Sequence, residues 1–548
     1  MHARPSRGRR RNSMIALTGA LALSLVVPAA TLGTSRHPNP SVAYVELTAN
    51  AAGGRVVPLI NSGQTFDGET FEGIPDGLGV VPVGQGQRYV ELYVAFEQSH
   101  VPFSGFADFE DSSVQRARLD LKTLQLTKLE EVLPPSAGFI RFCSAFMAGP
   151  DEGFDDYTFL LNEESNDVIH VPAGAPYGSD PSVDPYRQGG FSVYLNTKTG
   201  AYDEIAGLGR LNHENTVIVP GGWDQTVALT GDDTFNATES QVYMYAADDP
   251  DALIQDEGGL LAFRVTATDE GPVDPADPFN DANDYLDIEP GDSWSGEFIP
   301  VPGDVARGTT GERPQTALEN WSNANNVFQF IRVEDMAYDP DDPRTVYFTD
   351  TGTTRLEESD TTGRLFRPSA SAVPYINSDG RVFKMVMNED DPMVVDGFSI
   401  VAQGLLAEQL TNPLPPAQPT FRVIDPGVGF RQPDNLDVGS SSLMLQEDSA
   451  SNNRIWRYDL ASSWTHVGNV VNSGTSAESS GIIDMSDWLG AGWWALDVQG
   501  HRNLPGVEPP DGQPKLTYEV PLASPPSTLE YQKRREDGQL LLMHIPGT

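Results

Sequence analysis

The sequence contains a single cysteine, Cys143, within the stretch RFCSAF. A thiolate is a soft ligand that favours transition metals over calcium or magnesium. Glu163 and Glu164 follow about 20 residues later, and carboxylates beside a thiolate would form a shell for iron or zinc. A lone cysteine in apolar surroundings can also be a small buried hydrophobic residue. A nucleophilic role would need a base, for which His170 is one candidate.

A second group of chemically capable residues lies in RVEDMAYDP (332–340). On a strand, Arg332 and Glu334 point to the same face, and Asp335 is their neighbour. An arginine beside a metal-bound carboxylate suits phosphoryl transfer, because a guanidinium can hold phosphate oxygens in a bidentate manner. Taken alone, the stretch also fits a surface ion pair.

Histidine and amide groups accompany carboxylates at two further places. GRLNHENTV brings His213 and Glu214 together between asparagines, but it lacks the H-E-x-x-H spacing of a zinc site. DVQGH ends with His501, which could be a ligand, a proton carrier or a structural residue. Both stretches also fit loops whose side chains only form hydrogen bonds.

Oxygen donors recur in QPDNLDV and in LMLQEDS, which follows it closely. These two stretches supply Asp434, Asn435, Glu447 and Asp448. Carboxylate and amide oxygens from adjacent strands are the ligands that Ca²⁺ prefers.

The elements that must position these groups are short strands that end in acidic residues. Each has β-branched or aromatic residues over five to seven positions before a polar tip, and most precede a second strand and a turn. The strands are YVELYVAFE (89–97), YTFLLNEES (157–165), QTVALTGDD (225–233), RTVYFTDTG (344–352), SSLMLQEDS (441–449) and GWWALDVQGH (492–501).

Repeated units of this kind predict an all-β fold, a six-bladed β-propeller with long loop insertions, including an Asp/Pro/Gly-rich one near 250–330. Two unrelated β-sandwiches are the alternative, and they would not explain a repeated acidic tip. We expect the acid-tipped strands to be innermost, so that their tips converge at one end of the channel. Crowded carboxylates are stable when cations lie among them, which predicts a polymetal site. The candidate metal ligands are Glu97, Cys143, Glu163, Glu164, Glu214, Glu334, Asp335, Asp434, Asn435, Glu447 and Asp448, and the candidate catalytic residues are Arg332 and Glu334.

The N-terminus has the layout of an export signal. Arginines at 4, 7 and 9–11 precede an apolar run at 14–27 and then small residues, which predicts a signal peptide over 1–34 of the Tat or Sec type. Residues 41–548 would then form one secreted, periplasmic or cell-surface domain. No later apolar run is long enough to span a membrane, so we expect no stable membrane insertion.

The formal net charge of −43 argues against nucleic-acid binding, which needs basic residues to neutralise phosphates. It would also repel an anionic substrate unless bound cations reverse the local field. A solubility adaptation is another explanation for the charge. The chain has no G-x-S-x-G, P-loop, Rossmann glycine pattern or CxxC pair.

The ordered motifs resemble the PhoX-type alkaline phosphatase family, of which the chain would be a divergent member. The resemblance extends from about 73 to 501 in the family's order. Its motifs are GIPDGLGV, RFCSA, LNEES, HEN with VALTGDD, RVEDMAYDP, QPDNLDVGSSSLMLQEDSASNNRIWRYD and ESSGIIDMSDWLGAGWWALDVQGH.

The resemblance implies a secreted phosphatase that hydrolyses phosphate monoesters at iron and calcium ions. It assigns iron to Cys143 and the Glu163–Glu164 pair, with Glu214 as a further ligand, and assigns phosphate and metal handling to Arg332 and Glu334. Asp434 and Asn435 correspond to the family's PDN segment. The chain departs from relatives at Ala95, where many have asparagine, and at 144–146, where a glycine-rich stretch is usual.

We therefore expect a metal-dependent phosphatase that acts on a small phosphorylated substrate, contains Ca²⁺ and Fe³⁺ and is a monomer. Two alternatives come from other classes. One is a non-catalytic, calcium-stabilised propeller that binds an extracellular partner, which the departures would favour. The other is a calcium-dependent lactonase-like hydrolase, because Glu, Asn and Asp at strand ends also serve that chemistry.

Overall fold

The computed structural model groups Arg36–Thr548 into one compact unit. The expected signal peptide, His170 and His501 lie outside the described residues. The structure describes residues 36–84, 88–98, 111–166, 189–234, 240–274, 277, 282–285, 287–352, 379–404, 429–448, 453–461, 463–471, 477–500 and 537–547, and the backbone of 518–521 and 531–534.

Antiparallel sheets make up most of this unit. The first sheet has the order β5-β6-β7-β8 and the second the order β12-β11-β10-β9. Their strands are β5 (Pro75–Val83), β6 (Tyr89–Phe96), β7 (Val114–Asp120), β8 (Gln125–Leu133), β9 (Phe142–Ala148), β10 (Thr158–Glu163), β11 (Ser192–Asn196) and β12 (Tyr202–Ile205).

A ten-stranded sheet follows, with the order β13-β14-β15-β16-β18-β22-β21-β20-β19 and β17 paired to β16. Its strands are β13 (His213–Ile218), β14 (Thr226–Asp232), β15 (Val242–Ala247), β16 (Gly259–Thr268), β17 (Gly271–Pro272), β18 (Trp294–Pro300), β19 (Val333–Asp339), β20 (Asp342–Asp350), β21 (Arg381–Met387) and β22 (Val394–Gln403).

Two sheets join distant parts of the chain. N-terminal β1 adds to β26-β25-β24-β23, and β2 pairs with C-terminal β31 in the order β2-β31-β28-β27. Their strands are β1 (Val45–Leu47), β2 (Arg55–Asn61), β23 (Pro433–Gly439), β24 (Ser442–Glu447), β25 (Arg454–Tyr458), β26 (Trp464–Val470), β27 (Ala477–Asp484), β28 (Trp493–Gly500) and β31 (Asp537–His544).

The remaining elements are short. They are the hairpins β3 (Thr65–Phe66) with β4 (Glu69–Thr70) and β29 (Tyr518–Pro521) with β30 (Tyr531–Arg534), the helices α1 (Pro250–Ile254), α2 (Gly303–Ala306), α3 (Pro314–Ala324) and α4 (Ser486–Leu489), and the 3₁₀ turns η1 (Ala49–Ala51), η2 (Pro135–Ala137), η3 (Pro150–Glu152) and η4 (Ala206–Leu208). No helix among the described residues has the length and apolar character needed to cross a bilayer.

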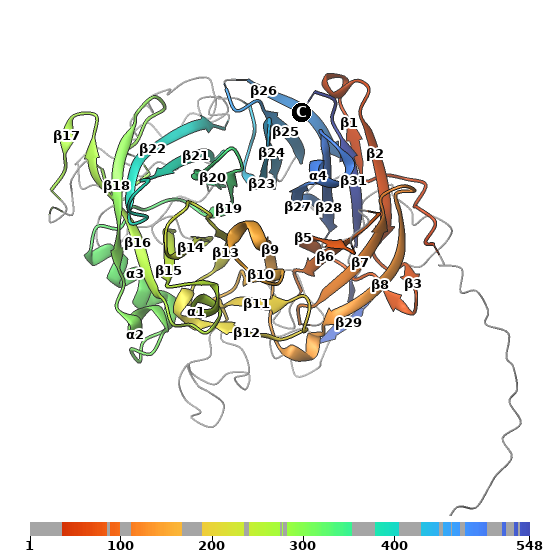
Figure 1. Ribbon diagram of the computed structural model, residues 1–548, viewed down its shortest axis with the longest axis horizontal. Helices are drawn as coiled ribbons and strands as arrows, with labels where there is room; N and C mark the ends of the chain where they lie inside the picture. Colours follow the sequence, from red (N-terminus) through yellow and green to blue (C-terminus); the bar gives the residue numbers. More distant parts are fainter. Residues whose placement is uncertain are drawn as a thin grey trace, which may run out of the picture. The chain divides into compact units, whose positions relative to one another are not determined.

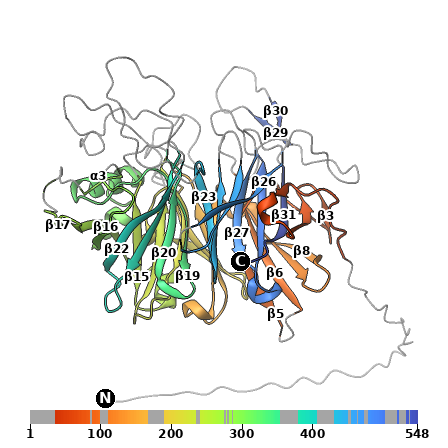
Figure 2. The same cartoon turned by 90° about the horizontal axis from the view of Figure 1, so that it is seen from above.

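The sheets have a propeller-like arrangement around a central channel. β5 contacts β9, and the contacts continue through β13, β19, β23 and β27, which returns to β5. Figure 1 shows these strands around the middle of the molecule, with the other strands of each sheet outside them. In the side view of Figure 2 the sheets stand beside one another. We call these innermost strands the channel strands.

The prediction that the acid-tipped strands are innermost is wrong. The tips belong to β6, β10, β14, β20, β24 and β28, and each of these strands is second in its sheet, next to a channel strand. The sequence pattern misled because a second strand is buried on both faces and therefore has the longest apolar run.

The region predicted as an insertion near 250–330 contains regular structure. β16 is the third strand after β13, and β18 pairs with both β16 and β22. The alternating sequence of β16 packs Leu261 and Phe263 into an apolar cluster. That cluster holds the T-shaped pairs Phe263–Phe398 and Phe330–Phe383, so aromatic packing supports the junction between β13–β16 and β19–β22.

Candidate metal centre

Each channel strand contributes the side chain of its second residue to one layer of the channel. These residues are Asp76 in β5, Cys143 in β9, Glu214 in β13, Glu334 in β19, Asp434 in β23 and Glu478 in β27. Five are carboxylates and one is the only thiol of the chain. The same position in successive sheets therefore carries the candidate chemistry.

A β-bulge follows the first residue of five of these strands. In β9, for example, Phe142 pairs with Glu163 and Ala145 with Leu161, so two residues oppose one on the partner strand. The same shift occurs after Pro75, His213, Val333 and Pro433. A bulge re-aims side chains and interrupts the strict alternation of faces. The two residues of each bulge are the ligand candidate and the residue after it, and both depart from the regular alternation.

The residues directly after the second strands lie at the same end of the channel. The amide of Glu97 donates to the carbonyl of Ile74 (3.0 Å), two residues before Asp76, and the amide of Glu164 donates to Arg141 (2.9 Å), two residues before Cys143. Asp233, Thr351 and Asp448 repeat this bond with Asn212, Arg332 and Gln432. One backbone bond therefore brings each of these residues beside a channel-strand ligand.

Among the described residues, four overlapping groups could each hold a metal ion. Within each group the ligand atoms lie within 4.8 Å of one another. The groups are Asp76–Glu97–Cys143, Cys143–Glu164–Glu214, Glu214–Glu334–Asp434 and Asp434–Asp448–Glu478. We call these nine residues the ligand layer. Cys143, Glu214 and Asp434 each belong to two groups, so the arrangement suits several ions that share ligands.

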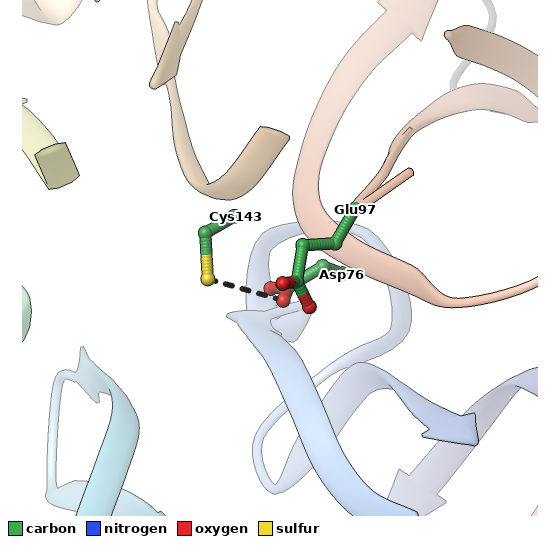
Figure 3. A group of neighbouring side chains, drawn as sticks. All are labelled: Asp76, Glu97 and Cys143. Atoms are coloured by element: carbon green, nitrogen blue, oxygen red, sulfur yellow. Dashed lines mark hydrogen bonds between the residues drawn. The ribbon is translucent and has the colours of Figure 1, made fainter. Parts of the chain in front are cut away.

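Figure 3 shows the first group, in which the side chains of Asp76, Glu97 and Cys143 point toward one another. The Cys143 Sγ lies 3.3 Å from Asp76 Oδ2. Gly77 allows β5 and β9 to approach so closely, because a Cβ atom there would lie 2.6 Å from the Cys143 carbonyl oxygen. The thiol is therefore held against oxygen donors by the packing of two backbones.

Hydrogen bonds beneath the ligand layer fix its side chains. Ser144 Oγ donates to Glu214 (2.6 Å) and accepts from Asn435 Nδ2 (2.8 Å). Ser480 Oγ donates to Asn435 Oδ1 (3.3 Å), and Gln499 Nε2 donates to Ser480 Oγ and Asp76 Oδ2, both at 3.1 Å. This chain of neutral groups orients two of the ligand carboxylates.

Burial and mutual repulsion raise the pKa of the acidic groups in the layer. Burial is the main cause of a pKa well above the ordinary value for Glu164, Glu214, Glu334, Asp434 and Glu478, and neighbouring carboxylates add to it. Burial also raises the pKa of Asp76 to about 6 and that of the Cys143 thiol well above its usual range. Cations among these groups would reverse both effects.

The donor set fits bound metal ions. Asp76 Oδ1 and Glu214 Oε2 are buried and have no hydrogen-bond partner among the described residues, although buried carboxylate oxygens are normally satisfied. The carboxylates suit calcium and the thiolate suits a softer metal. Cys143, Glu164 and Glu214 would hold a softer ion, and Glu334, Asp434, Asp448 and Glu478 would hold calcium.

Arg332 lies at the edge of the ligand layer. Its Nε and Nη2 donate to the two oxygens of Asp233 at 2.8 and 2.9 Å, and Nη2 is 3.1 Å from Glu334 Oε1. The residue has φ 61°, a conformation that L-residues seldom adopt, and its backbone N–H donates to Ser240 Oγ (2.7 Å). The guanidinium is therefore placed rigidly beside a ligand candidate.

Seven of the eleven predicted metal ligands belong to the ligand layer, and four do not. Glu163 accepts from the backbone amides of Ile140 (2.9 Å) and Phe191 (3.1 Å). Glu447 accepts from the Trp456 indole (2.9 Å) and pairs with Arg454 (2.8 Å). Both side chains are therefore used in hydrogen bonds and an ion pair with nearby residues of the fold.

Asp335 and Asn435 lie one residue beyond the ligand positions. Asp335 accepts from the backbone amides of Met336 (2.7 Å) and Leu436 (3.1 Å) and from the Asn215 side chain. Asn435 belongs to the hydrogen-bonded chain beneath the layer. Ala95, one of the departures from the family pattern, packs in an apolar cluster with Phe142.

Sequence reasoning missed Asp76 and Glu478 as ligand candidates and Asp233 as the partner of Arg332. Each lies in a motif that carried the family resemblance: GIPDGLGV, ESSG and VALTGDD. Asp76 and Glu478 are second in a channel strand just as Cys143 is, a relation that becomes visible once the structure shows where these strands begin.

The fold and the site define a mainly-β protein with a propeller-like arrangement of sheets and an acidic, thiol-containing layer in its channel. The model of the family described as alkaline phosphatase PhoX matches residues 193–486, more than half of the chain. The chain belongs to the PhoX alkaline phosphatase family, which confirms the predicted membership. No curated protein matches it.

One solved structure supports the fold. Pseudomonas fluorescens PhoX, in complex with vanadate as a transition-state analogue, has 14% sequence identity and a TM-score of 0.58, over 93% of this chain and 97% of that one. The PQQ-bound aldose sugar dehydrogenase of Streptomyces coelicolor has 12% identity and a TM-score of 0.33, over 89% and 99% of the two chains. At these identities the first match shows a shared fold.

Proposed function

We propose that this protein is a metal-dependent alkaline phosphatase that hydrolyses phosphate monoesters at the ligand layer. The observation that carries the proposal is the overlap of four ligand groups through Cys143, Glu214 and Asp434, with Arg332 beside them. Family membership supports metal dependence and a phosphorylated substrate. We further propose calcium and iron as the ions, from the ratio of hard oxygens to one thiolate.

The chain's own residues have distinct parts in this proposal. Bound cations would polarise the phosphoryl oxygens of a substrate and offset the repulsion between an anionic ester and the buried carboxylates. Arg332 is fixed by Asp233 and Glu334, so its positive charge needs little reorganisation to stabilise charge that develops on the phosphoryl group. Ser144 keeps Glu214 oriented through its hydrogen bond.

Two finer structural proposals accompany the function. We infer six blades, each begun by one channel strand, because the contacts of β5, β9, β13, β19, β23 and β27 close into a ring. We also propose that residues 1–34 direct export and are removed, from the arginine-rich and apolar segments of the sequence.

Metal analysis and phosphatase assays test the proposed function. We expect the protein loaded with calcium and iron to release phosphate from p-nitrophenyl phosphate. The Cys143→Ser variant should lose iron while its calcium and its circular dichroism spectrum are unchanged, because serine removes the soft ligand and keeps the shape.

Absence of phosphate release from metal-loaded wild type, with p-nitrophenyl phosphate and common phosphate monoesters, would overturn the proposal. Calcium without iron and without activity would instead favour the non-catalytic calcium-stabilised propeller. Lactone hydrolysis without phosphatase activity would favour the lactonase-like alternative.

A further inference from the structure

A cavity of about 550 Å³ opens farther along the channel strands than the ligand layer. It is lined by later residues of the same strands, such as Val80 of β5, Met147 of β9, Tyr338 of β19, Val438 of β23 and Ile483 of β27. Because the ligand candidates are second in these strands, the cavity lies toward the opposite end of the channel. We call it the distal cavity.

The lining of the distal cavity combines acidic, aromatic and sulfur-containing side chains. Six described residues of the lining are carboxylic acids, and the described lining contains no lysine, arginine or histidine. The acids are Asp151, Glu152, Asp335, Asp437, Asp484 and Asp487, and the aromatic and methionine residues are Phe146, Tyr157, Tyr338, Trp488, Met147 and Met336.

Neutral groups hold these carboxylates in place. Asp437 accepts from the backbone amides of Val438 (2.7 Å) and Asp484 (2.6 Å). Asp484 in turn accepts from the amide (3.1 Å) and the hydroxyl of Ser486 at the start of α4. Neither aspartate forms an ion pair with a described residue. Two fixed acidic groups therefore meet in the wall of the cavity without a basic partner.

Asp437 and Asp484 also disfavour each other's charge. Burial raises the pKa of Asp437 to about 7, and the nearby Asp484 contributes to this rise. Burial likewise raises the pKa of Asp484. A cation that entered the cavity would favour the ionised form of both groups.

Other residues of the lining offer aromatic surface. Phe146 and Tyr338 form a T-shaped pair with ring centroids 6.3 Å apart, and the Tyr338 hydroxyl donates to Glu152 (2.5 Å). Aromatic faces attract cations, and aromatic and thioether groups pack against apolar bodies. Cavities of this size that combine aromatic surface with a few placed polar groups commonly bind small molecules.

We propose that the distal cavity binds an organic cation with an apolar body, of the arylalkylammonium class. Its ammonium group would lie against Asp437 and Asp484, and its apolar part against Phe146 and Tyr338. A metal ion fits less well, because the groups of three close ligands that the described residues form all lie in the ligand layer. This site goes beyond the proposed phosphatase function and does not depend on it.

Isothermal titration calorimetry with phenethylammonium tests this proposal on the full chain in saturating calcium, which occupies the ligand layer. We expect one site, and binding at least tenfold tighter than that of the neutral isostere 2-phenylethanol. Asp484→Asn should weaken ammonium binding about tenfold. Asp203→Asn, which removes the same charge from an exposed position on β12, should leave the affinity unchanged.

Equal binding of the ammonium and the alcohol would overturn the proposal, and this comparison needs no variant to fold. Equal losses in Asp484→Asn and Asp203→Asn would also overturn it, by showing attraction to the net charge alone. An affinity that falls as calcium is raised would assign the ammonium to the ligand layer instead and would contradict the distal site.

Discussion

Adjacent acidic residues at the ends of the second strands have opposite roles. Glu163 is completely buried and its oxygens accept two backbone N–H groups, whereas Glu164, the next residue, belongs to the ligand layer. Glu447 and Asp448 repeat the contrast, since Glu447 binds Arg454 and Trp456 and Asp448 faces Asp434 and Glu478.

The contrast follows from strand geometry. Successive side chains of an extended chain point to opposite sides, so two neighbouring carboxylates cannot both face the channel. The first acid of each pair accepts hydrogen bonds from N–H groups near the end of the strand. The side chain of the second acid faces the channel. Acidic character alone therefore does not identify a metal ligand. An acidic residue without nearby N–H donors is the better candidate.

The strongest test of this contrast is Glu164→Gln. The substitution keeps the side-chain shape but removes a charged ligand from the group with Cys143 and Glu214. We expect phosphatase kcat/KM to fall on the order of 10³-fold, the upper range for loss of one electrostatic contributor, with loss of bound iron. Steady-state kinetics and metal analysis would measure both. Retained iron and near wild-type activity would contradict the assignment of Glu164.

Arg332→Lys tests the edge of the ligand layer with a smaller expected effect. Lysine keeps the positive charge but cannot form the two parallel bonds to Asp233. We expect kcat/KM to fall about 10²-fold with the metal content unchanged. Arg344→Lys is the matched control, because the ion pairs that Arg344 forms with described residues are long, at 3.7 Å, and lie at the surface. Activity within twofold of wild type in Arg332→Lys would exclude this role.

Glu163→Gln should affect stability instead of activity. The new amide would direct an N–H group at one of two backbone donors, those of Ile140 and Phe191. An unsatisfied buried donor costs about 1–3 kcal/mol, so we expect a lower free energy of unfolding with metal content and kcat retained. Urea denaturation would measure this. Loss of iron in Glu163→Gln would show that the two neighbours act alike.

Much of the fold could be predicted from the sequence, because strands have a strong local signal. The alternating and apolar runs located β6, β10, β14, β20, β24 and β28 within a residue or two. Their order within each sheet could not be predicted, since it depends on contacts between strands that are distant in sequence, such as β2 with β31. The ordered motifs still identified the family.

The ligand layer was harder to predict in its details. The tip residues Glu97, Glu164 and Asp448 could be found because they follow apolar runs. Asp76 and Glu478 could not, because the channel strands begin at bulges or close glycine contacts that leave no regular pattern. Gly481, for example, has φ 25° and approaches the backbone of Asp76, a tertiary contact without a local signature.

Strand β18 makes the part of the ring between β13 and β19 harder to deform than the rest. It is bonded on one side to β16 and on the other to β22, so β13 and β19 belong to one continuous sheet. Separating Glu214 from Glu334 by a movement of these sheets would require breaking a hydrogen-bonded ladder. The other described sheets are joined by side-chain packing and by single hydrogen bonds, such as that from the Leu436 amide to Asp335, and no strand ladder runs between them. The spacing of the Glu214–Glu334–Asp434 group is therefore the most firmly set between Glu214 and Glu334.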